Sequence, residues 1–301
     1  MINNVPTAES LYSSGKECFN LSWTMVYELL QDLEVAEEWN DIEREQKNNF
    51  WMAARRKLLA ALTIAQQGVE LVLKGDIAKV SPYLLISKFE ESAKKEGCDF
   101  SDFFTINEKN LIKVRNCVSD SSLADSFVTK YEKERKLRNE VMHLETKDYK
   151  SASDIEKLAI EILEYILNVC KVFFPSEKWI NNRFQYLENS TDHYIYDESD
   201  SQLQICYELN SIIKVLSPTS VKTYFGIDPK KKGYYCPNCY FNCDHNNGEM
   251  DEVKLARLIS KTELYCPACG KSFKVGKGSI CCCKDVHVYD DFCVNCSSQD
   301  H

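Results

Sequence analysis

Two short cysteine motifs are the residues of this chain best suited to chemistry. Cys236-Pro-Asn-Cys239 and Cys266-Pro-Ala-Cys269 each place two thiols on one tight turn. Two intervening residues let both sulfurs face one ion, and two such turns complete the tetrahedral all-sulfur set found at structural zinc sites. Chance is a poor alternative, because both Cys-Pro-x-Cys turns lie within residues 230–301. The spacing therefore predicts one zinc ion bound by these four thiols.

Further cysteines predict a second zinc site in the same tail. A run of three thiols, Cys281 to Cys283, precedes another Cys-x-x-Cys turn, Cys293 to Cys296. Consecutive residues cannot all face one ion comfortably, so one thiol of the run is expected to stay outside the set. The favoured ligands are Cys281, Cys283, Cys293 and Cys296. The alternative ligands are Cys243, Cys282, His245 and His287, and interleaved pairing of the motifs stays open.

Both zinc ions are expected to be structural. A catalytic zinc keeps an open position and usually has three protein ligands that include His or a carboxylate. Two all-thiolate sets leave no such position, and this argues against a zinc hydrolase. The other cysteines are scattered through the chain and are expected to be small core residues. They are Cys18, Cys98, Cys117, Cys170 and Cys206.

Arg138-Asn139 and His143 suggest a different chemistry. In a helix, Asn139 and His143 are four residues apart and share a face. Arg138 lies off that face, but its long guanidinium can swing back toward it. A neutral imidazole with a pKa of about 6.5 can take or deliver a proton at working pH. The arginine fork pairs with phosphate oxygens. Arg115-Asn116 has no His at the same spacing.

The elements that position this motif are predicted to be helices, from residue 20 to residue 175. From Trp51 onward, apolar residues repeat at alternating spacings of four and three, which indicates one buried helix face. They are Leu58, Leu62, Ala65, Val69 and Val72. Gly75 is expected to end that helix. Ser81-Pro82 is expected to begin the next one, which continues through YLLISKFEESAKK.

Three further helices are predicted before residue 175. A short one lies near Leu111–Val118, and a charged one covers residues 126–143 and carries the Arg-Asn…His motif. Ser153 and Glu156 are expected to form a capping box for the last helix, which Pro175 stops. The aromatic-rich segment that follows is expected to be an accessory helical segment or a spacer.

Over about 150 residues the sequence resembles the HEPN superfamily, named for higher eukaryote and prokaryote nucleotide-binding domains. The resemblance includes the helix ending in GVELVLKG, the SPYLLISKF segment, Arg-Asn-x-x-x-His and the closing helix. Many members are α-helical, metal-independent endoribonucleases whose motifs meet across a dimer. The resemblance implies catalytic roles for Arg138, Asn139 and His143, with Glu70 supporting the arginine. A surface pair of Glu70 with Lys74 is the alternative for that carboxylate.

The reaction implied by the resemblance is attack of an RNA 2′-hydroxyl on the adjacent phosphate. The products are a 2′,3′-cyclic phosphate and a 5′-hydroxyl, and the implied substrates are single-stranded RNA or tRNA loops. Toxin or phage-defence biology follows by family analogy only. In the alternative, the motif lies on a solvated helix. Arg138 then pairs with Glu132 or Glu134, and His143 caps the C-terminus.

Charge and hydropathy limit the function classes. The formal net charge of −9 argues against a general nucleic-acid-coating protein, because phosphate affinity depends on Lys and Arg. No basic-then-apolar leader and no apolar run long enough to cross a membrane is found in the sequence. We therefore expect the cytoplasm, where thiols stay reduced or bind metal.

The predicted fold class is mainly α, a HEPN-like helical bundle with a small β-rich zinc-binding domain. The predicted domains are residues 1–175 for the bundle, 176–229 for the accessory segment and 230–301 for the zinc module. The first hypothesis is an endoribonuclease that acts as a homodimer through its helical domain. Its zinc module would then be a head that docks RNA or protein.

The second hypothesis is a non-enzymatic adaptor. Its helices would form the dimer, and its zinc module would bind a nucleic acid or a partner protein. Lys271, Lys274 and Lys277, with Phe273 among them, can contact a nucleic-acid strand through charge and stacking. The alternative for these residues is a solvated β-hairpin.

Overall fold

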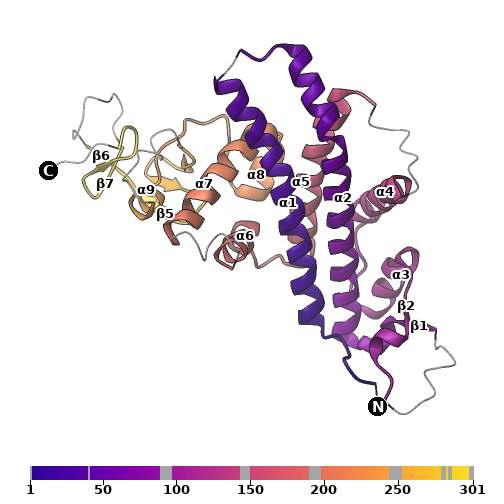
Figure 1. Cartoon of the computed structure of the whole chain (residues 1–301). Coiled ribbons are helices and arrows are strands. Elements are labelled where there is room, and N and C mark those ends of the chain that lie inside the picture. Colours follow the sequence, from indigo (N-terminus) through magenta and orange to yellow (C-terminus); the bar gives the residue numbers. More distant parts are fainter. Residues whose placement is uncertain are drawn as a thin grey trace. The chain divides into compact units, whose positions relative to one another are not determined.

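The computed structural model describes residues 2–39, 41–88, 97–142, 150–189, 198–243, 253–278, 283 and 287–297. It is mainly helical, with short strands confined largely to the cysteine-rich tail (Figure 1), so the predicted fold class is confirmed at the level of its elements. No helix in these ranges has the length and apolar character needed to cross a bilayer.

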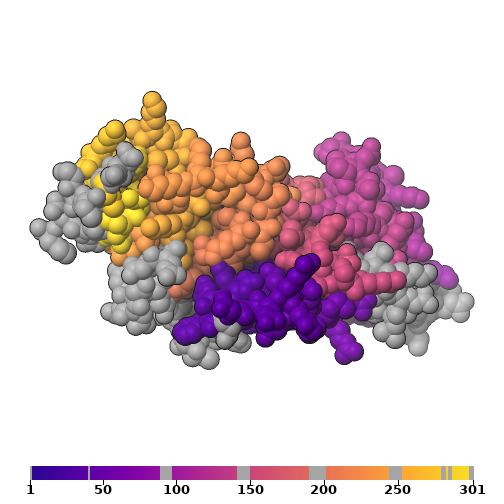
Figure 2. Space-filling view, turned by 90° about the horizontal axis from the view of Figure 1, so that it is seen from above, coloured from indigo at the N-terminus to yellow at the C-terminus, as the bar shows by residue number. Residues whose placement is uncertain are grey.

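The chain forms two compact units. The first contains Met1–Val26 and Ile42–Ile166, and the second contains Tyr27–Asp41 and Leu167–His301. The orange and yellow atoms in Figure 2 belong to the second unit. The predicted accessory segment, 176–229, and the cysteine-rich tail fall in the same unit.

Helices make up most of the first unit. They are α1 (Ala8–Trp39) up to Val26, α2 (Arg44–Val80), α3 (Glu108–Val118), α4 (Asp125–Met142) and α5 (Ala152–Phe173) up to Ile166. Within this unit α1 and α2 lie side by side (Figure 1), and the Ser22 hydroxyl donates to the Ala61 carbonyl oxygen at 2.8 Å. The helices predicted near 111–118 and over 126–143 are confirmed as α3 and α4.

The predicted apolar stripe of α2 is buried, and none of its members is more than 1% exposed. Gly75, however, does not end the helix, which runs on to Val80. A Cβ at Gly75 would lie 2.6 Å from Tyr12 Cε1, and one at Gly68 would lie 2.6 Å from Phe19 Cε1 and 2.9 Å from the Gly15 carbonyl oxygen. The prediction was wrong because these glycines allow α1 to approach α2, and a glycine that serves packing looks like a terminator in sequence.

The prediction of a helix after Ser81-Pro82 is also wrong for the residues that the structure describes. Ser81 precedes only one 3₁₀ turn, η1 (Pro82–Leu85), and the chain then enters β1 (Ile86–Lys88), which pairs antiparallel with β2 (Phe104–Thr105). The Leu85 carbonyl oxygen accepts from the Ile106 N–H at 2.8 Å. Backbone groups of residues 86–88 are thus used in strand pairing, which overrides the local helix preference. A second 3₁₀ turn, η3 (Phe100–Asp102), precedes β2.

Helix α5 begins earlier than predicted. Its cap is Ser151, whose Oγ accepts from the Asp154 N–H at 3.2 Å, while the Asp154 carboxylate accepts from the Ser151 N–H at 3.1 Å. Ser151 and Asp154 therefore form the capping box in place of the predicted Ser153 and Glu156. Asp154 stands three residues after the cap, where its carboxylate can accept a hydrogen bond as that of Glu does. The helix ends at Phe173, before Pro175, as predicted.

The second unit contains α6 (Trp179–Glu188), α7 (Glu198–Val215) and α8 (Pro218–Phe225). A bidentate ion pair joins the first two of these helices. Arg183 donates to Glu208 at 2.9 and 2.8 Å, and both side chains are only 2% exposed. Removing one partner would leave an uncompensated buried charge, so the pair fixes how α6 lies on α7.

The described residues of the cysteine-rich tail form one short helix and two small antiparallel sheets. The helix is α9 (Pro237–Asn242). The first sheet contains β3 (Arg257–Leu258), β4 (Glu263–Tyr265) and β5 (Ser272–Lys274). The second contains β6 (Gly276–Lys277), β7 (His287–Tyr289) and β8 (Phe292–Cys293). Strands this short bury little apolar surface, so the tail needs another source of stability.

The close approach of α1 to α2 makes a stability prediction. Gly68→Ala should lower the free energy of unfolding by about 1–3 kcal/mol, since the new methyl group meets a ring and a backbone oxygen that cannot both retreat. Gly276→Ala is the matched control, because a Cβ there meets nothing within 4 Å. Denaturant unfolding followed by circular dichroism measures both. Equal midpoints for Gly68→Ala and the parent would contradict this account of the contact.

Candidate metal centres and a polar cleft

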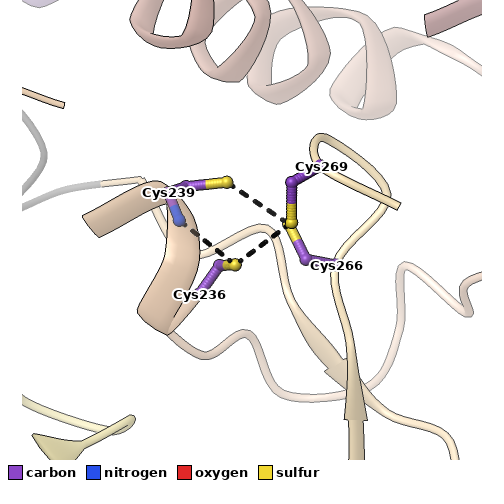
Figure 3. A group of neighbouring side chains, drawn as sticks. All are labelled: Cys236, Cys239, Cys266 and Cys269. Carbon is purple, nitrogen blue, oxygen red and sulfur yellow. Dashed lines mark hydrogen bonds between the residues drawn. The ribbon is translucent and has the colours of Figure 1, made fainter. Parts of the chain in front are cut away.

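The first cysteine set is held by two turns of different origin (Figure 3). Cys236 is the residue before α9, and its sulfur accepts from the Cys239 N–H at 3.5 Å. Cys266 follows β4, and its carbonyl oxygen accepts from the Gly270 N–H at 2.9 Å. Gly270 has a φ of +68°, the positive value that favours glycine there. A helix start and a strand end thus aim two pairs of thiols at each other.

The distances between the sulfurs suit one tetrahedral metal ion. All four Sγ atoms lie within 4.8 Å of one another. The Cys236–Cys269 separation is 3.6 Å and the Cys239–Cys266 separation is 3.8 Å. A tetrahedral ion with metal–sulfur bonds of about 2.3 Å places its ligands about 3.8 Å apart. Cys236, Cys239 and Cys266 are buried, so this group could hold a metal ion shielded from water.

A second group could also hold a metal ion. The sulfurs of Cys283, Cys293 and Cys296 lie within 4.8 Å of one another. Cys293 ends β8 and is fully buried. The predicted fourth ligand, Cys281, lies outside the described residues, as do Cys282 and His245. The described part of the chain therefore brings together three of the four predicted thiols.

Two of the alternative ligands have other surroundings. The His287 ring lies edge-on to Tyr234, with centroids 5.7 Å apart. Cys243 is buried at the C-terminal end of α9, where its N–H donates to the Cys239 carbonyl oxygen at 3.0 Å. Neither belongs to the two thiol groups found among the described residues.

One residue beside the first centre had no signal in the sequence. Gln202, on α7, has its Nε2 3.7 Å from the sulfurs of both Cys206 and Cys239. An amide N–H that points at a ligand sulfur can orient it and stabilise its thiolate form. Cys206 is buried, as predicted for a core cysteine, and it lies against this centre.

The helical unit carries a polar cleft of about 390 Å³. At its centre Arg138, from α4, donates through Nη2 to Glu70 Oε1, from α2, at 2.5 Å. The side chains are 23% and 19% exposed, so the pair is partly shielded but open to the cleft. The lining residues are Thr63, Gln67, Glu70, Leu71, Lys74 and Arg138. The resemblance implied that Glu70 supports Arg138, but no sequence signal pointed to Thr63 and Gln67, which share their face of α2 with Glu70.

Burial and the neighbouring positive charges shift the pKa of Glu70 in opposite directions. Burial is the larger effect and raises the pKa of its carboxyl above the ordinary value, while the Arg138 guanidinium lowers it. Lys74 also lowers it, although the Lys74 ammonium lies 3.5 Å from Thr105 Oγ1 and makes no ion pair in the described part of the chain. Arg138 is therefore the main group that offsets the effect of burial on the pKa of Glu70.

The solvated-helix interpretation of Arg138 does not match its contacts. Glu132 pairs instead with Arg135, at 2.6 Å, and Glu134 is buried. Asn139 follows Arg138 on α4 and does not line the described cleft. His143 lies outside the described residues, so its position relative to Glu70 and Arg138 stays a prediction.

The Arg115-Asn116 pair, which has no histidine at the motif spacing, has a structural role. Arg115 on α3 donates to the Asp76 carboxylate on α2 at 2.8 Å and to the Ser121 carbonyl oxygen at 2.5 Å. Asp76 also accepts from the Tyr12 hydroxyl at 2.5 Å. Asp76 therefore links α2 to Tyr12 on α1 and to Arg115 on α3.

Phe273, the residue predicted to stack on nucleic-acid bases, is not available to them. Phe273, at the centre of β5, is 8% exposed and packs edge-on against Tyr289, with centroids 5.2 Å apart. Side chains alternate along a strand, so Ser272 and Lys274 face outward when Phe273 faces inward. Lys271, Lys274 and Lys277 are exposed, but the aromatic contribution proposed for Phe273 was wrong.

A buried carboxylate lies one turn before Arg138 on α4. Glu134 is 1% exposed, and neither of its oxygens has a hydrogen-bond partner among the described residues. The nearest cation is Lys133, with Nζ 4.0 Å from Oε1. Burial is the main cause that raises the pKa of Glu134, and Glu161 adds to it. The neutral acid is thus the better tolerated form in the folded state.

The sign of the resulting pH dependence follows from linkage. A carboxyl whose pKa is raised by folding keeps its proton to higher pH than the unfolded chain does, so stability falls as the pH rises above 4.5. Glu134→Gln should therefore be more stable than the parent at pH 7.5, with a smaller difference at pH 4.5. Denaturant unfolding at both pH values measures this. Glu45→Gln, at an exposed position of α2, is the control, and an unchanged difference between the two pH values would rule the effect out.

Comparisons with protein-family models, with curated proteins and with solved structures found no match for this chain. The resemblance to the HEPN superfamily therefore depends on the motif residues alone. The geometry of the thiol groups and of the polar cleft is what the structure adds, and any function has to be argued from it.

Proposed function

We propose that the helical unit is a HEPN-type, metal-independent endoribonuclease. The observation that carries this proposal is the Glu70–Arg138 pair in an open polar cleft. The pairing expected from the resemblance is the one observed. An arginine fixed by a carboxylate has a restricted direction, and its remaining N–H groups can donate to a phosphate. This is the arrangement that stabilisation of a charged transition state requires.

The proposed reaction needs three groups. The 2′-oxygen of RNA attacks the adjacent phosphorus, and His143 takes the 2′-hydroxyl proton. The bond from phosphorus to the 5′-oxygen breaks, and a protonated imidazole from the second copy of the motif in a homodimer gives that oxygen a proton. The products are a 2′,3′-cyclic phosphate and a 5′-hydroxyl. Arg138 holds the phosphate oxygens as their charge grows, Asn139 orients the imidazole or donates to the phosphate, and Glu70 positions Arg138.

The charges along the cleft favour an anionic substrate. Arg138 and Lys74 contribute two positive charges, and Glu70 contributes one negative charge. The described residues that line the cleft thus have a net charge of about +1, although the whole chain has a net charge of −9. A local site of this kind is compatible with RNA binding by an acidic protein, because phosphate contacts depend on the residues at the site.

Arg138→Lys tests the role of the planar guanidinium group of Arg138. Lysine keeps the charge but cannot make the bidentate contact or reproduce the pairing with Glu70, so kcat should fall about 10²- to 10³-fold. The measurement is cleavage of a single-stranded RNA library in EDTA, with analysis of the product ends. Arg56→Lys, at an exposed position of α2, is the control and should cleave like the parent.

His143→Ala gives the stricter outcome. Removing the proton-transfer group should abolish cleavage while far-UV circular dichroism and RNA binding stay at the parent level. Cleavage by His143→Ala at the parent rate would overturn the catalytic proposal. RNA bound but left intact by the parent protein would instead support the adaptor.

We also propose that the thiol groups hold two structural zinc ions per chain. Zinc fits an all-sulfur tetrahedral site, and the measured Sγ separations suit its bond length. The short strands around the sites bury too little apolar surface to be stable by themselves. Metal binding would supply the missing free energy of folding.

Cys239→Ser tests the first site. The variant should lose one zinc per chain by inductively coupled plasma mass spectrometry, and the tail should become sensitive to protease. Cys117→Ser, at an exposed position on α3, should retain the parent zinc content. A parent protein with less than about one zinc per chain would contradict the assignment.

A further inference from the structure

Lys74 is the cation of the polar cleft that the proposed reaction does not use. It lies on α2 four residues after Glu70, so both side chains project from the same helix face. It lines the same cleft as Arg138. The side chain is half-buried, its ammonium approaches Thr105 Oγ1 at 3.5 Å, and within the described ranges no carboxylate pairs with it. A lysine that lines a cleft and forms no close ion pair has donors for an anion, although Glu70 lies within electrostatic reach of Lys74.

The chemical character of the residues that line the cleft changes along α2. Thr63 and Gln67 precede Glu70 by two turns and one turn, and Lys74 follows it by one turn. Neutral hydrogen-bonding groups therefore lie at one end, the Glu70–Arg138 pair at the centre and a single cation at the other end. An extended chain with evenly spaced negative charges fits this order better than an isolated anion does.

We propose that Lys74 binds the phosphate next to the scissile one, so that the cleft takes a single-stranded RNA segment with two successive phosphates. The proposal rests on the proposed ribonuclease function, in which Arg138 holds the scissile phosphate. Adjacent turns of α2 are about 5.4 Å apart along the axis, which is the scale of one nucleotide step. Gln67 and Thr63 then face the sugar and base on the opposite side of the cut.

This assignment separates substrate binding from the chemical step. Lys74 is a compact point charge on a flexible stem, suited to a phosphate but not to a bidentate clamp. Its contact exists in the ground state as well as in the transition state. Loss of such a contact raises KM more than it lowers kcat. Loss of Arg138 should lower kcat more than it raises KM.

Lys74→Gln is the test variant, and the probe is a fluorescent 2′-O-methyl RNA oligonucleotide, which cannot be cleaved. Its Kd, measured by anisotropy at several salt concentrations, should rise about tenfold, and the slope of log K against log salt should fall by about 0.7, the value for one phosphate on a single strand. With cleavable RNA, KM should rise by a similar factor. Lys74→Arg should restore the salt slope.

Lys79→Gln is the matched control, because Lys79 is exposed on the same helix and does not line the cleft. Its Kd and salt slope should equal those of the parent. If the parent cleaves RNA and Lys74→Gln leaves the salt slope and KM unchanged, the Lys74 proposal is overturned and the ribonuclease proposal stands. If no RNA is cleaved but the slope falls in Lys74→Gln, the strand-binding role stands and the ribonuclease proposal is overturned.

Discussion

The helical unit depends on pairing polar groups across its interior. Helix α4 carries Glu134, Arg135 and Arg138 on faces that are buried or half-buried. Charged groups are costly there unless a partner from another helix compensates them. Glu70 provides that compensation for Arg138, and the raised pKa of Glu70 shows that burial is only partly offset. An ion pair of this kind fixes the register of α4 on α2 because neither partner can move away alone.

The stability of that arrangement and the proposed activity are linked through the same atoms. Arg183, which pairs with Glu208, is only 2% exposed and is closed off from any ligand. Arg138 is 23% exposed and faces a cleft with Lys74. The comparison separates a structural pair from a pair that can still reach a ligand. This exposure is a physical reason to treat the Glu70–Arg138 pair as a candidate site.

Periodicity and cysteine spacing predicted what depends on local pattern. The α2 stripe and the Cys-x-x-Cys turns follow from rules that act within a few residues, and both are seen. The failures share a cause in long-range contacts. Gly75 looks like a helix terminator in the sequence because nothing there shows that Tyr12 packs on it. Residues 86–88 join a strand through a partner many residues later. The roles of Gln67 and Gln202 could not be predicted from the sequence, because only the fold brings them next to the cleft and to Cys239.

The glycine contacts between α1 and α2 have a consequence for motion. Gly15 and Gly68 approach so closely that sliding α1 by one residue would drive a side chain into backbone. The contacting parts of the two helices therefore behave as one stiff body, and the residues that α2 contributes to the cleft, among them Glu70, move with it. A change in the width of the cleft would need a movement of α4 relative to α2, against the Glu70–Arg138 ion pair and the buried apolar side chains of α4. Helix α2 thus gives the cleft a fixed wall, and the position of α4 against that wall sets its width.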